Sequence, residues 1–180
     1  MPTVVTHAVV AAALSSALPR PVISRRLIVI GAICAMVPDL DVIGFAFGIR
    51  YGDLLGHRGL SHSIAFAVCL ALIATFGAVS RDARWKERII VYFYLFLATA
   101  SHGVLDALTN GGLGIAFFSP FDPTRYFFEF QPIKVSPIGA HFFSGQGVEV
   151  IRSELAWVWV PSFAVIIVAI GLRGLITRSQ

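Results

Sequence analysis

The stretch Thr99-Ala-Ser-His-Gly-Val-Leu-Asp-Ala-Leu-Thr-Asn-Gly-Gly112 closes a long apolar run that begins at residue 89. Within it, His102 and Asp106 are four residues apart, so they share one face of a helix. An imidazole and a carboxylate at this spacing can chelate one divalent metal, although a buried His–Asp hydrogen bond would also explain the pair. The sequence Asn110-Gly-Gly112 is expected to end the helix, because glycine tolerates the left-handed conformation found there.

The composition indicates a membrane protein. Of 180 residues, 57% are hydrophobic and 13% are charged, a balance far from that of a soluble domain. The length is that of one domain, so we expect residues 1–180 to form a single membrane-embedded domain. The net charge of +4 does not form a basic stripe interleaved with aromatics, which argues against a nucleic-acid partner. Cys34 and Cys69 lie inside apolar runs and are interpreted as small buried residues.

Apolar runs separated by polar loops predict an all-α polytopic bundle of about five spans, because a span needs about 20 predominantly apolar residues. The runs are residues 3–18, 27–37 continued by 42–49, 64–79, 89–100, and 155–176. Pro38-Asp-Leu-Asp41 interrupts the second run, where we expect a broken or kinked helix. The segment of about residues 115–154 is rich in Phe, Pro and Gly. We expect it to lie at the membrane interface and to cover the polar groups as a lid.

Lysine and arginine are divided unequally between the two ends of this bundle. Nine lie in the loops 19–26 and 80–88 and in the C-terminal tail: Arg20, Arg25, Arg26, Arg81, Arg84, Lys86, Arg88, Arg173 and Arg178. Five lie on the other side: Arg50, Arg58, Arg125, Lys134 and Arg152. The positive-inside rule therefore places the N-terminus outside the membrane and the C-terminus in the cytoplasm.

This topology brings imidazoles and carboxylates from four separate pieces of chain to one membrane depth, towards the outer face. The candidate metal ligands are His7, Asp39, Asp41, His57, His62, His102 and Asp106. Ionisable groups in apolar spans are costly and usually face an interior, where they are paired or bind a metal. Histidine and aspartate suit Zn²⁺, with Mn²⁺ or iron as alternatives. Seven groups exceed one tetrahedral shell, so we expect one or two ions.

Each piece also has an interpretation without a metal. His7 and His62 could each hydrogen-bond inside a helix, and His57 could belong to an interfacial loop. One acid of Pro38-Asp-Leu-Asp41 could cap a helix N-terminus. Arg58 offers a planar fork suited to phosphate, but it could equally be a side chain that reaches the headgroup level. The metal interpretation depends on all four pieces meeting at one place.

The order and spacing of these motifs resemble the YdjM-like family of inner-membrane metal-dependent hydrolases over roughly the first two-thirds of the chain. The motifs are Thr6-His7, Pro38-Asp-Leu-Asp41, His57-Arg-Gly-Leu-Ser-His-Ser63, His102-Gly-Val-Leu-Asp106, Thr109-Asn-Gly-Gly112 and Ser119-Pro-Phe. The resemblance implies distant kinship with zinc-dependent phospholipase C and the P1-type nucleases, which are helical enzymes that hydrolyse phosphoesters. Family members are also described as binding the LexA repressor, so the resemblance implies a LexA-type protein as a candidate partner.

The resemblance also implies roles for individual residues. His102 and Asp106 would match the shared ligand pair, with Asp106 bridging two metals, and His7 would match an N-terminal histidine ligand. One of the two acids Asp39 and Asp41, and one of the two histidines His57 and His62, would complete the first metal site. No further His/Glu ligand series follows Asp106, so a third zinc is not expected.

These observations predict a metal-dependent hydrolase of the phospholipase C type that acts on a phosphoester in a membrane lipid or lipid-linked substrate. Asp39 or Asp41 is the candidate general base, and Arg58 is the candidate phosphate clamp. The main alternative is a non-enzymatic membrane protein, either a metal or proton carrier or a partner-binding scaffold. A carrier should place ionisable groups along a path, whereas here they gather at one depth. An amide- or ester-cleaving metalloenzyme would use the same ligands, and the oligomeric state stays open.

Overall fold

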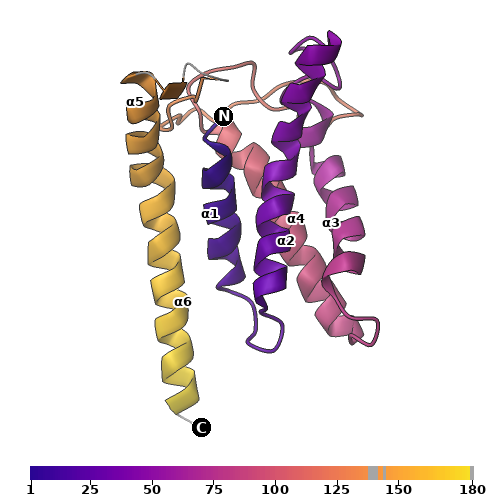
Figure 1. The fold of residues 1–180 in the computed structure, drawn as a ribbon, viewed down its shortest axis with the longest axis vertical. Helices are drawn as coiled ribbons and strands as arrows, with labels where there is room; N and C mark the ends of the chain where they lie inside the picture. Colours follow the sequence, from indigo (N-terminus) through magenta and orange to yellow (C-terminus); the bar gives the residue numbers. More distant parts are fainter. Residues whose placement is uncertain (138–141, 144, 179–180) are drawn as a thin grey trace.

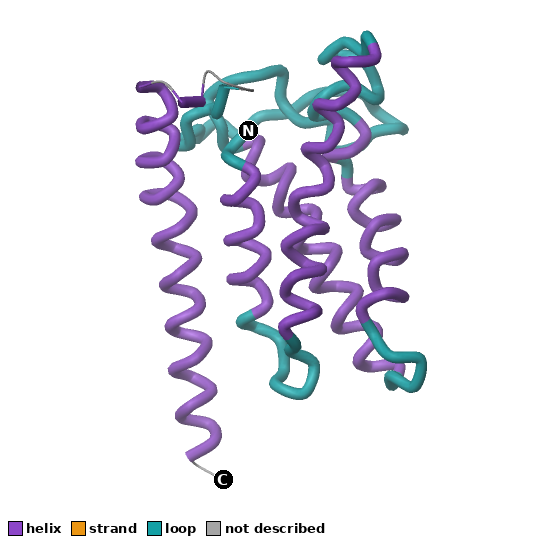
Figure 2. Tube along the Cα trace, viewed as in Figure 1, coloured by secondary structure: helices purple, strands orange, loops and turns teal. Residues whose placement is uncertain are grey.

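A computed structural model describes residues 1–137, 142–143 and 145–178, and it is helical, with five apolar helices side by side (Figure 1). These helices are α1 (Val4–Ser15), α2 (Arg25–Met36), α3 (Ile64–Ala78), α4 (Trp85–Ala107) and α6 (Val160–Arg178). The shorter elements are the 3-10 helices η1 (Val37–Phe47) and η2 (Leu60–His62), helix α5 (Gly145–Glu154) and the π-helical turn η4 (Leu155–Trp159). The described residues form no strand (Figure 2), so the predicted all-α class is confirmed.

Among the described residues, three stretches are long and apolar enough to cross a membrane, which makes the expected count of about five spans somewhat generous. They are Arg25–Phe47, Trp85–Ala107 and Gly145–Leu175. Helices α1 and α3 are also apolar but have only 12 and 15 residues, fewer than the ~20 that a perpendicular span needs. Both shorter helices lie between or beside the long ones in Figure 1. The bundle is therefore a mixture of long and short apolar helices.

The helix break expected at Pro38 is present in a milder form. Helix α2 does not stop there but tightens into the 3-10 helix η1, which has a proline in its first turn. Proline has no backbone N–H and cannot continue the α-helical hydrogen-bond pattern, which fits the change from α-helix to 3-10 helix here. Gly48 ends η1 in the left-handed conformation, with φ of 79°. The tightened segment carries Asp39 and Asp41 beyond the end of α2.

Helix α4 lies at the centre of the packing and contacts α1, α2 and α3. Three alanines, Ala11, Ala35 and Ala98, are fully buried where these helices approach, as expected for close packing through small residues. The Tyr94 hydroxyl donates a hydrogen bond to the carbonyl of Ala11 over 3.2 Å. Gly31 makes this possible, because a Cβ atom there would lie 2.1 Å from the Tyr94 hydroxyl oxygen.

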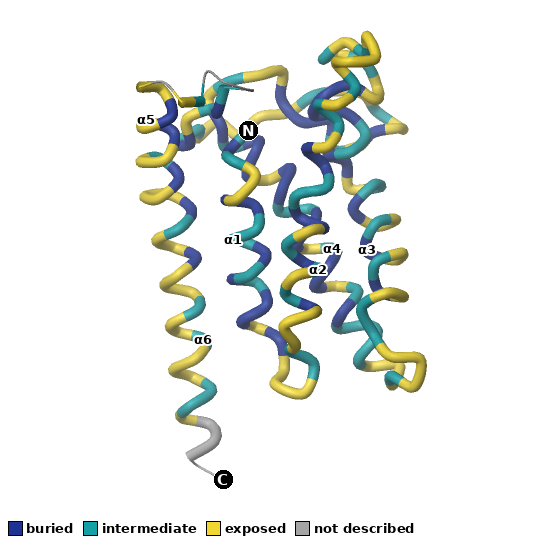
Figure 3. The backbone as a smooth tube through the Cα atoms, in the orientation of Figure 1, coloured by how far each residue is buried: buried dark blue, intermediate teal, exposed yellow. Residues whose placement is uncertain are grey.

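Helix α6 lies at the edge of the bundle beside α1, and most of its residues up to 175 are exposed (Figure 3). Near its start, Trp159 Nε1 donates to Thr6 Oγ1 over 2.7 Å. Near its end, Arg173 donates to the carbonyls of Ser16 and Leu18. An apolar helix that buries so little of its surface needs an apolar surrounding medium, which the hydrocarbon core of a membrane provides.

The last helix begins earlier than the sequence suggested. We expected a span from residue 155, but helix α5 begins at Gly145 and continues through η4 into α6. Val150 and Glu154 are buried, which explains why this less apolar stretch is helical. Part of the predicted lid is therefore the first turns of the last helix.

The remainder of the predicted lid, up to residue 137, crosses one end of the bundle (Figure 2). Arg125 fastens it there by donating from Nη1 to the carbonyl of His57 and from Nη2 to the carbonyl of Tyr51, each over 3.1 Å. Residues 138–141 and 144, among them His141, lie outside the described residues. Whether the segment opens and closes as a lid stays a prediction.

Candidate metal centre

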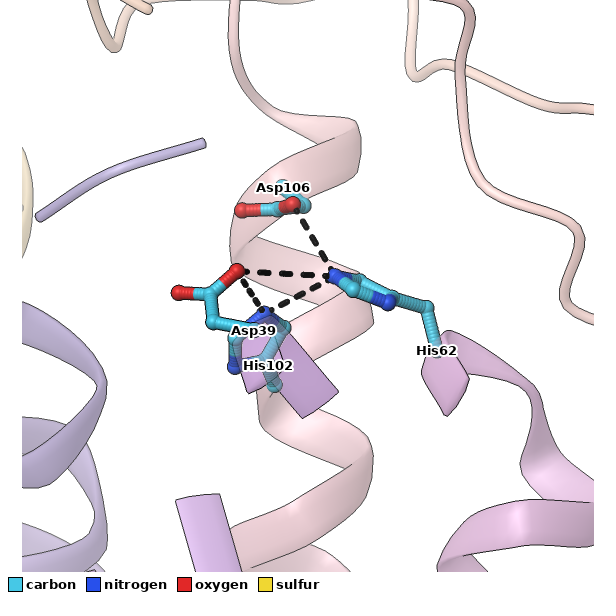
Figure 4. Close-up of side chains that lie close together, drawn as sticks. All are labelled: Asp39, His62, His102 and Asp106. Carbon is cyan, nitrogen blue, oxygen red and sulfur yellow. Dashed lines mark hydrogen bonds and ion pairs between the residues drawn. The ribbon is translucent and has the colours of Figure 1, made fainter. Parts of the chain in front are cut away.

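Four side chains from three elements meet inside the bundle: Asp39 from η1, His62 from η2, and His102 and Asp106 from α4 (Figure 4). Each offers one ligand atom, and these atoms all lie within 4.8 Å of one another. His102 and Asp106 are 0% exposed, and Asp39 and His62 are 5% exposed. Buried carboxylates and imidazoles this close together need a compensating cation or proton.

The separations suit a metal ion. His102 Nε2 lies 3.0 Å from His62 Nε2 and 3.3 Å from Asp39 Oδ1. His62 Nε2 lies 3.8 Å from Asp39 Oδ1 and 3.5 Å from Asp106 Oδ2. A tetrahedral zinc ion with bonds of about 2.1 Å would hold its ligand atoms about 3.4 Å apart. The four separations lie on either side of this value, so the donors are close enough together to share a single ion.

The histidines are oriented as metal ligands are. His102 Nδ1 lies 2.6 Å from the carbonyl oxygen of Ala35, so Nδ1 carries the proton and Nε2 presents its lone pair. His62 Nδ1 lies 2.9 Å from Ser61 Oγ and 3.2 Å from Asp41 Oδ2, which likewise leaves Nε2 directed at the cluster. Metal-binding histidines commonly donate their second N–H to a carbonyl or carboxylate in this way.

A proton on His62 is the alternative to a metal. Burial opposes a charge on this ring, but hydrogen bonds to Asp106 and Asp41 raise the pKa of His62 to about 9. A proton on Nε2 would also relieve the contact with His102. That proton would face Asp106 Oδ2, 3.5 Å away, but both oxygens of Asp39 and Oδ1 of Asp106 would keep no hydrogen-bond donor. A metal ion accounts for more of these orphaned atoms than a single proton does.

The other predicted ligands surround this group of four. His7 is fully buried, its ring stacks on that of His102 with centroids 3.6 Å apart, and its Nε2 lies 3.6 Å from Asp106 Oδ1. Neither ring nitrogen of His7 has a hydrogen-bond partner. His57 bonds Asp41 over 2.7 Å, and together with His62 they form a second group with metal-ligand spacing. The structure thus brings all seven predicted residues into one neighbourhood.

Arg58 is turned inward and is 0% exposed. Its Nε lies 3.1 Å from Asp106 Oδ2, and its Nη1 and Nη2 donate to the Gly111 carbonyl and to Thr109 Oγ1 over 2.7 and 3.0 Å. The backbone of Arg58 has a positive φ of 65°, which is rare for a residue with a side chain. In this arrangement Arg58 braces Asp106, and its use as a phosphate clamp stays a prediction.

Two supporting groups were not identified from the sequence. Ser61 donates to Asp41 Oδ2 over 2.6 Å while its oxygen faces His62, and its place inside the motif of residues 57–63 is the signal that could have found it. The buried Glu154 accepts hydrogen bonds from the hydroxyls of Thr3 and Thr6, over 2.7 and 2.6 Å, next to His7. Glu154 is the last residue of the predicted Phe-, Pro- and Gly-rich segment, and nothing local distinguishes it from a surface acid.

The fold and the site together define a class, a helical membrane protein with a buried His/Asp cluster that can hold a metal ion. Within that class the chain belongs to the YdjM inner membrane protein family, which matches residues 1–176. It is 42% identical over 164 residues to the inner membrane protein YbcI of Escherichia coli (strain K12), covering 89% of this chain and 92% of that protein. No solved structure matches the chain.

Proposed function

We propose that this protein is a membrane-embedded metal-dependent hydrolase that cleaves a phosphoester in a lipid or lipid-linked substrate. The observation that carries the proposal is the set of four buried donors within 4.8 Å of one another, with orphaned carboxylate oxygens and oriented imidazoles. Zn²⁺ suits this donor set, and Mn²⁺ or iron would also accept it. A lipid substrate is inferred from the position of the cluster inside a bundle of apolar helices.

The residues of the site would act as metal ligands, as the general base, or as groups that hold the ligands in place. His62, His102 and Asp106 would hold the ion, and when bound such an ion lowers the pKa of a water molecule and neutralises charge on phosphoryl oxygens. Asp39 places Oδ1 beside both histidines, while its Oδ2 has no partner and can accept a proton from the attacking water. Arg58 holds Asp106 in place through their 3.1 Å contact.

A second candidate function follows if the protein fills all four coordination positions of the ion. If Asp39 ligates as well, the protein supplies four ligands and no position is left for water, which is typical of structural zinc. The ion would then hold η1, η2 and α4 together in a scaffold for a partner, for which a LexA-type repressor is a candidate only by family resemblance. The two functions make different predictions for Asp39.

The test begins with bound metal and hydrolysis in the purified chain. We expect about one or two equivalents of metal per chain in the wild type, with metal content at least tenfold lower in His102→Ala and Asp106→Ala. Asp39→Asn should retain metal but release phosphate or headgroup from mixed lipids 10²–10⁴-fold more slowly, because the general base is lost. Asp53→Asn, the same change on an exposed loop, is the matched control and should leave metal content and rate unchanged.

Each outcome decides between the candidates. Unchanged metal content in both alanine variants would remove the ligand assignment. Metal that binds and stabilises the fold without any hydrolysis, together with loss of metal in Asp39→Asn, would favour the structural scaffold. Hydrolysis of amides or carboxylic esters but not phosphoesters would keep the metal centre and replace the substrate class.

A further inference from the structure

A cavity lies at the end of the bundle away from the metal centre. It has a volume of about 500 Å³ and lies between the loop that precedes α2 and the first turns of α4. Its lining includes Pro21, Val22, Arg84, Trp85, Lys86 and Glu87. His102 and Asp106 lie near the opposite end of α4, so this cavity is separate from the metal centre.

The cations of this cavity are free to bind a ligand. Within the described part of the chain, the side chains of Arg84 and Lys86 make no hydrogen bond or ion pair, and both are exposed. Nearby basic residues are committed elsewhere: Arg26 donates to the carbonyl of Gly77, and Arg88 donates to three carbonyls of the preceding loop. Two unpaired cations beside a hollow favour an anionic ligand.

The remaining lining indicates what kind of anion this is. The side chain of Trp85 is 74% exposed, and tryptophan is enriched where the apolar part of a membrane meets the headgroups. Val22 and Ile90 add apolar walls where α4 enters the apolar part of the bundle. Glu87, half-buried, is the one acid of the lining. A ligand with a negative head and an apolar body matches these walls better than a free anion does.

We propose that this cavity binds the headgroup of an anionic phospholipid, with Arg84 and Lys86 on the phosphate and Trp85 and Val22 along the glycerol and upper acyl chains. Basic pockets between membrane helices commonly bind anionic lipids, and each basic residue near an anionic surface strengthens binding several-fold. The site is independent of the metal centre and of any hydrolysis there.

The experiment uses the full-length purified chain in detergent with phosphatidylglycerol as the probe. Native mass spectrometry and thermal unfolding should show bound phosphatidylglycerol and a raised Tm for the wild type, and neither with phosphatidylcholine. The double variant Arg84→Gln/Lys86→Gln should bind phosphatidylglycerol at least tenfold more weakly. Glu87→Gln should bind it more tightly, because the opposing charge is removed.

The matched control removes one arginine and one lysine at the other end of the molecule. Arg50→Gln/Lys134→Gln should bind phosphatidylglycerol as the wild type does. Inorganic phosphate should neither raise Tm nor compete, and if it does both, the ligand is a free anion and the proposal fails. Equal binding of phosphatidylglycerol by the wild type and by Arg84→Gln/Lys86→Gln, or equal binding of phosphatidylcholine and phosphatidylglycerol by the wild type, would also overturn it.

Discussion

Asp41 lies behind His62 and collects hydrogen bonds from several directions. Its Oδ1 lies 2.7 Å from His57 Nδ1, and its Oδ2 accepts from the backbone N–H of Arg58 and the hydroxyl of Ser61, over 3.1 and 2.6 Å. The same oxygen is 3.2 Å from His62 Nδ1. A carboxylate so occupied is better suited to orient His62 than to accept a proton from water. It acts on the candidate metal centre through the imidazole between them.

Replacing Asp41 should therefore weaken metal binding without removing a ligand. We expect Asp41→Asn to lower metal affinity 10- to 100-fold, since groups that orient metal-binding histidines contribute about that much. Metal titration followed by equilibrium dialysis measures the change, and Asp53→Asn provides the same chemical substitution on an exposed loop. Wild-type affinity in Asp41→Asn would show that His62 does not depend on it. Complete loss of metal would instead make Asp41 a ligand.

The sequence predicted which residues gather around the candidate metal centre, but not which of them face the ion and which support the ligands. His102 and Asp106 could be paired because both lie on one helix, where spacing alone fixes their common face. The choice between Asp39 and Asp41, or between His57 and His62, depends on how η1 and η2 turn against α4, and no local pattern records that. The side chain of Arg58 turns inward because its own backbone has a positive φ. It also needs glycine at position 112, where a Cβ atom would lie 2.5 Å from Arg58 Nη1.

The helices themselves were largely predictable, because long apolar runs bounded by proline, serine and charged loops leave few alternatives. Ser24 and Ser63 accept hydrogen bonds from the backbone N–H groups of Leu27 and Phe66, as N-terminal caps should. What hydropathy could not give is the length of each helix, so the short α1 and α3 were counted as spans. The early start of α5 was missed for a related reason, since it depends on buried contacts of Val150 and Glu154.

The contact between α2 and α4 offers a test of the packing. Gly31→Ala should lower stability by about 1–3 kcal/mol, because the new methyl group would displace the Tyr94 ring and its hydrogen bond to Ala11. Gly171→Ala in α6, where a Cβ atom meets nothing within 4 Å, is the control and should raise stability slightly through helix propensity. Thermal unfolding of both variants in one detergent makes the comparison. A Gly31→Ala protein as stable as Gly171→Ala would show that α2 and α4 are not closely packed there.

Considered as a whole, the molecule has two chemically different ends. The metal centre and the segment that ends at residue 137 occupy one end, while the loops before α2 and α4 and the C-terminal end of α6 occupy the other (Figure 1). The second end carries most of the arginine and lysine, as well as the cavity with Arg84 and Lys86. The fold brings these basic loops, distant in sequence, to one end, as the alternation of apolar runs in the sequence predicts. The positive-inside rule then predicts that this end is cytoplasmic.

That orientation can be measured with single cysteines. In a Cys69→Ser background, which keeps only the buried Cys34, we expect Phe121→Cys to react with a membrane-impermeant maleimide in intact spheroplasts. Phe121 is 89% exposed and lies in the segment at the metal-centre end. Asp82→Cys, in the exposed loop between α3 and α4, should react only after lysis. The reverse pattern would place the metal centre in the cytoplasm, where its substrate would have to come from the inner leaflet or from soluble phosphoesters. Labelling at both positions before lysis would indicate mixed insertion, which the nine-to-five division of basic residues argues against.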